Sequence, residues 1–437
     1  MADSSPGTTH LRLTPTQLSQ HFRFRCERKL RWEMAPADAG APAQVRPGMG
    51  LLSAAGRAFE RRKVATLVRH FGADAVLVGG TTPRGDAVAI PTGRVLEVLR
   101  DPGEVRFLVQ PRLELPDPEG FAARYGIDPE LVRLAPAQPD LIRIGRWADG
   151  WPRLGVIDIK WSGERAIQHF AQVAFYALVL EEIVAAAGLD ARVDPRWGWV
   201  WNRGARTPRR FALGAYRHHV ERFLREELPR IAALEPVDAA WHLGPRCAGC
   251  GFFHHCRATA DAADDLSRVP GITPIARQVL HERGIRTVAQ LNLRGINAGT
   301  YTGCHALESG ESVLKKRAMA LSYKRMVEQE KATHLLGVRE RVAVIVTAEA
   351  DPVSGTVFAL GFRAERAGAR PAVDVLLSRE GTPEGESELL RDFLARLGDV
   401  VRAMLSARAE GEGARGEKPL HVFVYDRPEL ELLRGVL

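Results

Sequence analysis

Two strand-like segments joined by a tight-turn signal place the strongest constraint on how this chain folds. The sequence predicts strands over residues 140–147 and 153–161. Ala148-Asp149-Gly150 lies between them and is a hairpin signal. When the segments are folded about that turn, Asp140 falls opposite Asp158 or Ile159. Directly opposed side chains lie roughly 5 Å apart at Cβ, so the two acidic residues are predicted to meet.

A lysine joins this acidic pair. Side chains two positions apart share a strand face, so Asp158 and Lys160 point one way while Ile157 and Ile159 point the other. Carboxylates hold Mg²⁺, and the metal polarises a phosphate and activates water. Lys160 is then placed to orient that water or to offset charge that develops on the phosphate. The grouping favours phosphodiester hydrolysis, although an isolated Asp-x-Lys occurs in many surface hairpins.

A long apolar helix is predicted over residues 164–187, and Gly188 is expected to end it. Gln168, Gln172 and Tyr176 follow one another at intervals of four residues and therefore lie on one face of this helix. Buried polar groups without partners cost free energy. The stripe is therefore expected to face other polar groups.

The order Pro139-Asp140, Asp158-Ile159-Lys160 and Gln172-x-x-x-Tyr176 resembles the RecB-like PD-(D/E)XK nucleases. The resemblance implies an α/β, restriction-endonuclease-like core with helical additions. It implies that the acids bind Mg²⁺ or Mn²⁺, that Lys160 is catalytic, and that Gln172 and Tyr176 support the site and the DNA strand. The implied activity is metal-dependent cleavage of single-stranded or end-containing DNA, in repair, recombination or defence.

The same resemblance implies a metal ligand on an upstream helix, which the sequence predicts over residues 51–71. The family often has a histidine after Gly-x-x-x, and here Gly56-Arg57-Ala58-Phe59-Glu60 puts Glu60 in that position. His70 is the rival, but it lies roughly 15 Å further along a helix, so the two cannot bind the same ion. We expect Glu60 to be the ligand, and an exposed helix charge is the alternative.

Four of the five cysteines form a candidate metal site. Cys247-x2-Cys250-x5-Cys256 is compact, and clustered thiols in a reducing cytosol indicate metal or iron–sulfur binding before disulfides. Spacing leaves both zinc and an iron–sulfur cluster open. Cys26 before the nuclease motifs and three cysteines after them resemble the iron–sulfur branch, which includes AddB-type and CRISPR-associated RecB-like enzymes. That implies a [4Fe–4S] cluster stapling the domain, whereas Cys304 is expected to be an ordinary side chain.

The expected domains are a nuclease over 1–260, a helical segment over 261–333 and a partial ribonuclease H-like α/β domain over 334–437. Within the second, residues 266–283 resemble a helix–hairpin–helix, and a plain helical linker is the alternative. In the third, Thr347-Ala348-Glu349 stands where the first strand usually has Asp-x-Glu, so we expect no activity there. Further expectations are strands over 342–346, 356–362 and 422–425, a turn at 351–355 and a flexible loop over 407–418.

Composition bears on partners and location. Lys plus Arg exceed Asp plus Glu by 61 to 53, and the formal net charge of +8 favours a polyanion, here DNA. Residues 202–210 form a basic loop suited to phosphates or to a solvated hairpin tip. With no run of about 20 apolar residues and a polar start, no membrane span is expected and the chain is predicted to be cytoplasmic.

The resemblance also implies a superfamily 1 helicase as a partner, in cis or in trans. The rival function is a non-cleaving DNA-binding module with a structural metal cluster that serves such a helicase. The retained Asp140, Asp158 and Lys160 argue against that rival, because a module that only binds DNA has no use for them.

Overall fold

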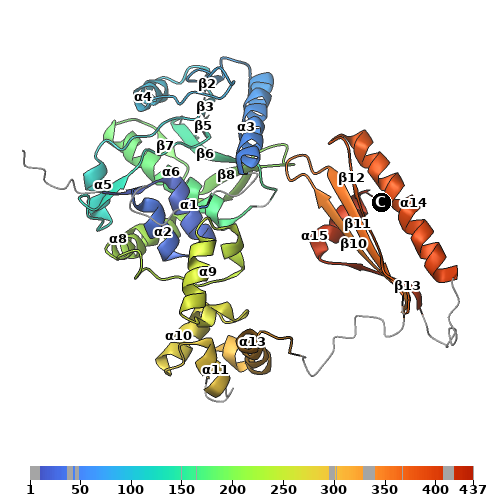
Figure 1. Cartoon of the computed structure of the whole chain (residues 1–437). Coiled ribbons are helices and arrows are strands. Elements are labelled where there is room, and N and C mark those ends of the chain that lie inside the picture. Colours follow the sequence, from blue (N-terminus) through green and yellow to red (C-terminus); the bar gives the residue numbers. More distant parts are fainter. Residues whose placement is uncertain are drawn as a thin grey trace, which may run out of the picture. The chain divides into compact units, whose positions relative to one another are not determined.

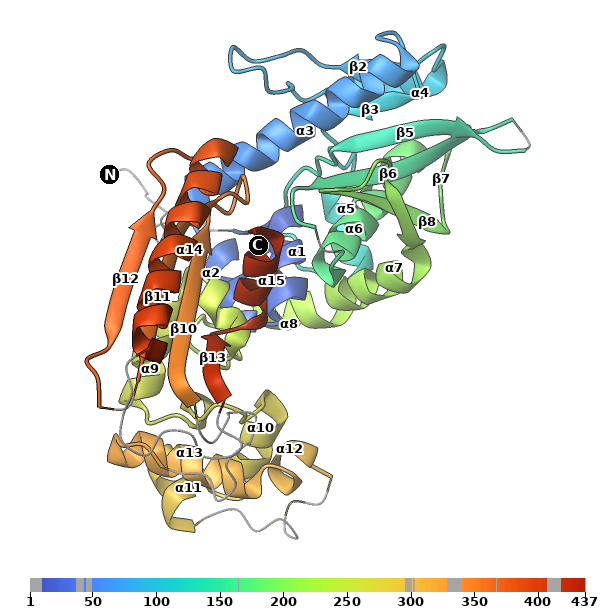
Figure 2. The same cartoon turned by 90° about the vertical axis from the view of Figure 1, so that its right-hand side faces the viewer.

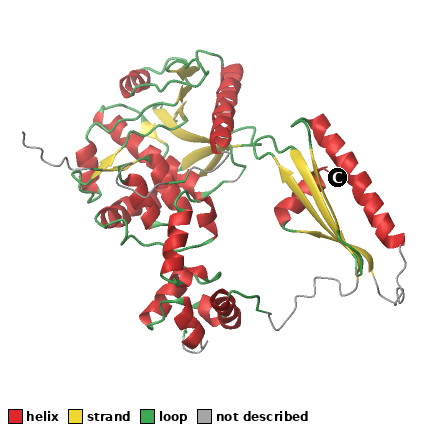
Figure 3. Cartoon of the chain, viewed as in Figure 1, coloured by secondary structure: helices red, strands yellow, loops and turns green. Residues whose placement is uncertain are grey.

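The chain folds into two compact units, Met1–Val327 and Glu328–Leu437, and each is considered by itself. The computed structural model describes residues 10–36, 43–44, 49–148, 150–163, 165–294, 301, 303–327, 340–366, 368–406 and 418–436. Each unit combines helices with a sheet of mixed strand direction, which confirms the α/β class (Figures 1 and 3). The expected boundaries at 260 and 333 stay predictions.

A seven-stranded mixed sheet forms the centre of the first unit. Its order is β2-β3-β5-β6-β8-β9, and β7 also pairs with β6. Its strands are β2 (Val76–Val78), β3 (Phe107–Val109), β5 (Leu141–Arg146), β6 (Pro152–Lys160), β7 (Arg192–Val193), β8 (Trp197–Asn202) and β9 (Arg209–Ala212). β5 and β6 are antiparallel, whereas β6 and β8 run parallel. A separate parallel pair joins β1 (Leu11–Leu13) to β4 (Val132–Leu134).

Helices lie on both sides of the β5–β6 hairpin (Figures 1 and 2). The alternation of β6 explains why: Leu154 and Val156 join the core built on α6 (Ile167–Ala186), and Ile157 and Ile159 join a second core that includes residues of α3 (Met49–Phe71). A strand buried on both faces is typical of such three-layer packing. Both layers are therefore anchored on the hairpin that carries the acidic residues.

The central helix α6 is unusually apolar. By length and composition it is the one helix in the described part of the chain that could cross a membrane, but 78% of its apolar window is buried inside the protein. Its buried side chains contact α1 (Pro15–Phe24), the sheet and α7 (Leu213–Arg222). The apolar character of α6 is thus explained by its place in the core.

The remaining helices of this part of the unit are short. They are α2 (Glu27–Met34), α4 (Thr92–Arg100), α5 (Pro118–Arg124), the π-helical turn η1 (Phe223–Glu227) and α8 (Leu228–Ala232). α1 begins at a capping box in which Thr14 accepts the backbone N–H of Gln17 and the Gln17 side chain accepts that of Thr14. It ends at Arg25, whose φ of 53° is left-handed. That turn brings Cys26 to the start of α2.

A helical segment follows, with its own apolar core of buried side chains between Leu266 and Ala318. Its elements are η3 (Leu266–Arg268), α10 (Pro274–Glu282), α11 (Val288–Arg294), α12 (His305–Glu308) and α13 (Glu311–Tyr323), and η2 (Pro245–Gly249) and α9 (Phe253–Ala262) precede it. The buried side chains that hold it together include Leu266, Leu280 and Leu314.

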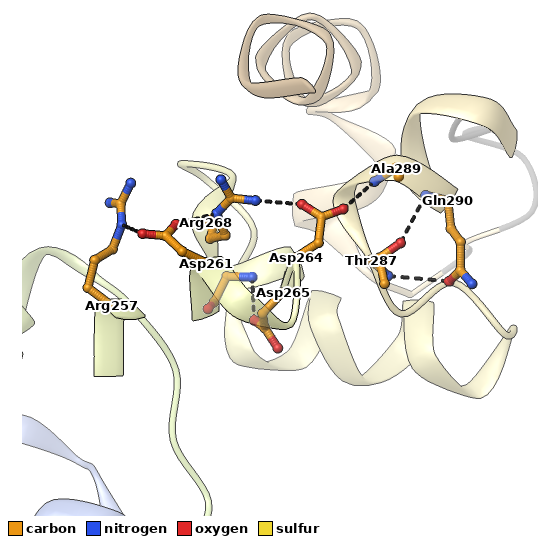
Figure 4. Close-up of polar contacts among 9 residues, drawn as sticks. Arg257, Asp261, Asp264, Asp265, Arg268, Thr287, Ala289 and Gln290 are labelled. Atoms are coloured by element: carbon orange, nitrogen blue, oxygen red, sulfur yellow. Dashed lines mark hydrogen bonds and ion pairs between the residues drawn. The ribbon is translucent and has the colours of Figure 1, made fainter. Parts of the chain in front are cut away.

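The turns of this segment are held by internal polar contacts (Figure 4). Asp264 accepts the Ala289 N–H at 2.8 Å and an Arg268 guanidinium N–H at 2.5 Å, and Thr287 accepts the Gln290 N–H at 3.1 Å. The N–H groups of Ala289 and Gln290 at the start of α11 are therefore occupied from within the protein. The helix–hairpin–helix assignment, with its implied phosphate contact, stays a prediction.

The second unit is a four-stranded sheet of order β12-β11-β10-β13. Its elements are β10 (Glu340–Ala350), β11 (Val357–Glu365), β12 (Ala372–Leu377), α14 (Pro383–Ser406), β13 (Lys418–Val424) and α15 (Arg427–Val436). β10, β11 and β12 are antiparallel neighbours, and β13 runs parallel to β10. The expected strands and the turn, where the Gly355 N–H donates to the Asp351 carbonyl at 2.8 Å, are confirmed.

Several boundaries differ from those expected. The helix predicted from residue 164 begins at Ile167, because Ala166 has an extended backbone and serves as its N-cap. The helix predicted from residue 51 begins two residues earlier. Each end of the two hairpin strands differs by one residue from the predicted bound. A flexible loop is expected over residues 407–418, but Lys418 begins β13. Residues 407–417 lie outside the described residues.

Packing of the sheet against α6 depends on a glycine in β8. A Cβ at Gly198 would lie 2.6 Å from the Phe211 ring and 2.8 Å from Val173 of α6. We therefore expect Gly198→Ala to lower the free energy of unfolding by roughly 1–3 kcal/mol. Gly214→Ala in α7, where a Cβ meets nothing within 4 Å, is the matched control. Urea denaturation measures both, and equal stability of the two variants would contradict this packing.

Candidate active site

The end of the β5–β6 hairpin brings two carboxyl groups together. Leu141 pairs with Ile157, so Asp140, one residue before β5, lies opposite Asp158. The predicted pairing of the acids is therefore confirmed. The Ile159 N–H donates to Asp140 Oδ2 at 2.5 Å, which fixes that carboxyl across the strands. At the far end of the hairpin Gly150 has a φ of 87°, as the turn requires, and Asp149 lies outside the described residues.

Lys160 lies beside Asp158, as the strand alternation predicted. Its Nζ is 2.9 Å from Asp158 Oδ1, and the Asp158 residue is 1% exposed. No N–H group of the described residues donates to the other, buried oxygen, Asp158 Oδ2, and the Asp140 carboxyl lies within hydrogen-bond reach of the Asp158 side chain. A buried carboxylate oxygen without a donor is costly. Asp158 Oδ2 is therefore able to accept a contact from a positively charged ligand.

Helix α6 presents polar side chains to the same site. Gln172 Nε2 donates to the Tyr176 hydroxyl at 2.8 Å, and both residues are buried. Burial raises the pKa of Tyr176 well above its ordinary value, and the charges of Asp158 and Asp140 raise it further. Tyr176 therefore stays protonated beside the acids. Gln168, one turn earlier on the predicted stripe, is more exposed, so only part of that stripe is buried.

Glu60 of α3 reaches the site from the other side of the hairpin. It lines the same cavity as Asp140, and Gln110 Nε2 lies 3.4 Å from Glu60 Oε2. His70 is exposed near the end of α3, where its ring contacts Phe71, and it does not line that cavity. Of the two rivals, the structure therefore places Glu60 with the acids.

The electrostatics of the site are dominated by negative charge in a buried place. Burial raises the pKa of Asp158 to about 7, and the neighbouring Asp140 adds to the shift while Lys160 opposes it. Burial and then Asp140 raise the pKa of Glu60 to about 7, and burial raises that of Asp140. Burial alone would lower the pKa of Lys160, but Asp158 and Asp140 outweigh it and raise that pKa. Three carboxyl groups thus share one ammonium group.

Two further residues belong to this site and carried no sequence signal. Gln110 has a left-handed φ of 47°, and its N–H donates to the Asp140 carbonyl at 2.8 Å, which positions the backbone of that acid. His169 is buried in the first turn of α6, and burial followed by the charge of Lys160 lowers its pKa to about 4. His169 is therefore neutral at pH 7 and adds no charge to the site.

The four predicted cysteine ligands come together in a second place. Cys26, Cys247, Cys250 and Cys256 line one cavity of about 1060 Å³. Burial raises the pKa of Cys26 to about 11, and the other three thiols contribute to the shift. η2 brings Cys247 and Cys250 together, with the Cys250 N–H donating to the Cys247 carbonyl at 2.9 Å. Cys304 is buried in the core of the helical segment instead.

Neither the carboxyl groups nor the cysteine thiols of the described residues are arranged around one point as metal ligands would be. Among the described residues no group of three or more His, Cys, Asp or Glu side chains is arranged so that it could hold a metal ion as it stands. No family model and no curated protein matches the chain. The chemistry that the site can carry out therefore has to follow from its own geometry.

The raised pKa of Asp158 predicts a pH-dependent stability. The folded state binds this proton more tightly than the unfolded state, for which the pKa is 3.8. The stabilisation of the folded state that comes from this Asp158 proton is therefore fully present below about pH 4 and is lost as the pH rises through about 7. In EDTA, we expect Asp158→Asn to exceed the wild type in stability at about pH 8 by roughly 1–4 kcal/mol, and by less at about pH 5.

Urea denaturation of both proteins at the two pH values measures this difference. Asp128→Asn removes an exposed carboxyl group and is the matched control, which should follow the wild type at both pH values. Parallel pH profiles for Asp158→Asn and the wild type would show that Asp158 is not buried as described.

Proposed function

We propose that this protein is a metal-dependent DNA nuclease with a RecB-like, restriction-endonuclease-like core. The observation that carries the proposal is the meeting of Asp140, Asp158 and Lys160 at the end of one strand hairpin, with Glu60 on the adjoining cavity. Acids alone are common at protein surfaces. Here they are buried, opposed and accompanied by one lysine, which is the set that phosphodiester hydrolysis needs.

The donor chemistry of the residues present suits a divalent ion. Asp158 Oδ2 is a buried acceptor without a donor, and burial raises the pKa of each of the three carboxyl groups. All three are hard oxygen donors, which suit Mg²⁺ or Mn²⁺. Asp140, Asp158 and Glu60 are the residues that would hold the ion. When bound, such an ion polarises the phosphate and lowers the pKa of a coordinated water.

Lys160 and Tyr176 supply the chain's own part in the chemistry. The pKa of Lys160 is raised above its ordinary value, so its Nζ remains charged at neutral pH. A fixed ammonium group in a buried site stabilises negative charge that develops on a phosphate. Tyr176 stays neutral and accepts a hydrogen bond from Gln172, so its hydroxyl proton is free to be donated toward an oxygen of the site or the strand.

Basic and aromatic side chains gather at the end of the strand that carries Lys160. The guanidinium of Arg203 lies 4.5 Å from the Trp161 ring centroid, and that of Arg62 lies 5.8 Å from it. Trp161 directly follows Lys160 in the chain, so Trp161 and its two arginines lie beside the strand end that carries the site. Arginine and aromatic side chains together suit the phosphates and bases of a single strand. The Arg203 N–H also donates to the Lys160 carbonyl at 3.2 Å, so the expected basic loop begins beside the lysine of the site, which supports DNA as the substrate.

The cysteine set fits a soft metal centre. Four thiols share one cavity, and thiolates suit an iron–sulfur cluster or zinc, which would displace their protons. Cys26 lies near the start of the unit and the other three lie far later in the chain, so a centre there would tie two distant segments together. We assign it a structural role, with a [4Fe–4S] cluster as the first choice and zinc as the alternative.

We assign no catalysis to the second unit. Asp426 accepts the N–H of Glu429 at 2.9 Å, and Glu429 accepts the N–H groups of Ala348 and Tyr425 at 3.0 and 2.9 Å. Asp426 thus caps the start of α15, and Glu429 joins α15 to β10. Glu349 remains, beside a neutral Thr347 two residues earlier on β10. A single carboxyl group is a poor holder of catalytic metal ions.

The central test is cleavage of end-labelled single- and double-stranded DNA with Mg²⁺, Mn²⁺ or EDTA. We expect cleavage with either metal and none with EDTA. Asp158→Ala and Lys160→Ala should each lower the rate by a factor of at least about 100, because each removes a group that the transition state needs. Circular dichroism checks that both variants fold. Equal rates for the wild type and Lys160→Ala would overturn the catalytic assignment.

The same assay separates Glu60 from His70. Glu60→Ala should raise the Mg²⁺ concentration needed for half-maximal rate, because it removes one of three oxygen donors. His70→Ala, a substitution on the same helix away from the cavity, is the control and should leave that concentration unchanged. The opposite pattern would move the ligand to His70.

The cysteine assignment predicts a coloured protein. Purified without oxygen, it should be brown and contain about four irons per chain. Cys26→Ser should lose the metal and melt at a lower temperature, whereas Cys304→Ser, which lies in a separate core, should retain the metal. Stoichiometric zinc without iron would replace the cluster by a zinc staple. Full metal content in Cys26→Ser would remove that residue from the site.

A further inference from the structure

A cavity of about 530 Å³ opens directly beside the acidic residues. One wall is α3 and the other is a short hairpin after β2, in which Thr81 pairs with Ala87. Glu60, Gln110 and Asp140 line one part of it. The rest is apolar, and its walls are formed by Val64, Ala65, Val68, Val78, Ala87 and Val109. Cavities of this size in proteins typically take ligands as large as a nucleotide.

Three arginines line this cavity together with three acids, Glu60, Asp86 and Asp140. Arg57, Arg61 and Arg69 of α3 line it, and Arg57 interacts electrostatically with Glu60 at the acidic end. Arg61 pairs with Asp86 of the hairpin at 2.5 Å, and Arg69 donates to the Thr66 hydroxyl at 3.3 Å. An occupant that suits both the walls and the arginines has an apolar, flat part and an anionic part.

The hairpin wall is held in place before any ligand arrives. A Cβ at Gly79 would lie 2.7 Å from the Val88 carbonyl oxygen, so the two arms of the hairpin approach closely only because residue 79 is glycine. The Val88 N–H donates to the Gly80 carbonyl at 2.9 Å, and the Arg61–Asp86 ion pair ties the tip to α3. A preformed wall lowers the ordering cost of binding.

We propose that this cavity receives one nucleotide of the DNA strand, the one adjacent to the phosphate at the acidic residues. The proposal rests on the proposed nuclease function, because the acids at one end of the cavity mark where that phosphate lies. The base and sugar then occupy the volume between Val64, Val68 and Val78, and the arginines of α3 contact the flanking phosphates.

The lining also predicts how selective this subsite is. Its apolar walls carry no amide or carboxyl group, since Gln110 lies at the acidic end and Asp86 is paired with Arg61. Reading a base requires hydrogen bonds to its edge. The subsite therefore accepts any of the four bases and responds to whether a base is present, not to which one it is.

The test is binding of a fluorescent single-stranded oligonucleotide in EDTA, measured by anisotropy, so that no cleavage occurs. The oligonucleotide is short enough to fill the binding site in one register, and one abasic residue is moved through it in a series. Ala65→Trp places an indole in the cavity from an exposed helix position, and Ala54→Trp, exposed on the same helix outside the cavity, is the matched control. Melting temperatures confirm that both variants fold.

For the wild type and Ala54→Trp, we expect one abasic position to weaken binding about tenfold. Ala65→Trp should bind the intact strand about tenfold more weakly, and the abasic series should be flat, because base and indole compete for one space. Wild-type affinity in Ala65→Trp, or a flat series in the wild type, would overturn the proposal. So would a free deoxynucleoside monophosphate that binds the cavity more tightly than the strand.

Cleavage with Mg²⁺ is measured separately on the same proteins. If the wild type does not cleave but the abasic effect depends on Ala65, the nuclease function fails and the nucleotide subsite stands as a binding site. If the wild type cleaves and Ala65→Trp binds and cleaves like Ala54→Trp, the subsite fails and the nuclease function stands.

Discussion

Two carboxyl groups, from Asp140 and Asp158, are held opposite each other by the pairing of β5 with β6. Their position depends on the strand register, because a slip of one residue would turn Asp158 and Lys160 to the opposite face and bring Ile157 and Ile159 in their place. Both of those isoleucines are buried against the α3 layer, which fixes the register by burial of apolar surface. The core that stabilises the first unit is thus also what forces the acids together.

Holding these groups together is unfavourable for the protein without a cation. Asp158 is almost fully buried, and its one charged partner, Lys160, is shared with Asp140. Buried charges that lack compensation cost several kcal/mol each (on the order of 3–5). The core of α6 and the sheet offsets this cost, since helix and strands bury apolar side chains on both sides of the acids. A site that is unfavourable by itself but well supported is typical of one selected for binding or chemistry.

The sequence predicted the local part of this arrangement and missed the part made by distant segments. The hairpin, the partnership of Asp158 with Lys160 and the Gln172–Tyr176 pair follow from strand and helix periodicity, which local physics sets. The strands of the second unit follow from the same alternation. Gln110 and His169 could not be found in this way, because their roles come from a left-handed backbone and from burial beside Lys160. The start of α6 was misplaced by three residues because an extended Ala166 caps it in place of a polar residue.

The proposed nuclease function requires the acids to act together as one site for a divalent cation. Calorimetric titration of the metal-free protein with Mn²⁺ near pH 7 tests this most directly, with buffers of different ionisation enthalpy to count released protons. The raised pKa values of Asp158 and Glu60, each about 7, predict binding accompanied by proton release, and binding should be lost in Asp158→Asn. Undiminished Mn²⁺ binding by Asp158→Asn, or no binding by the wild type, would contradict the account.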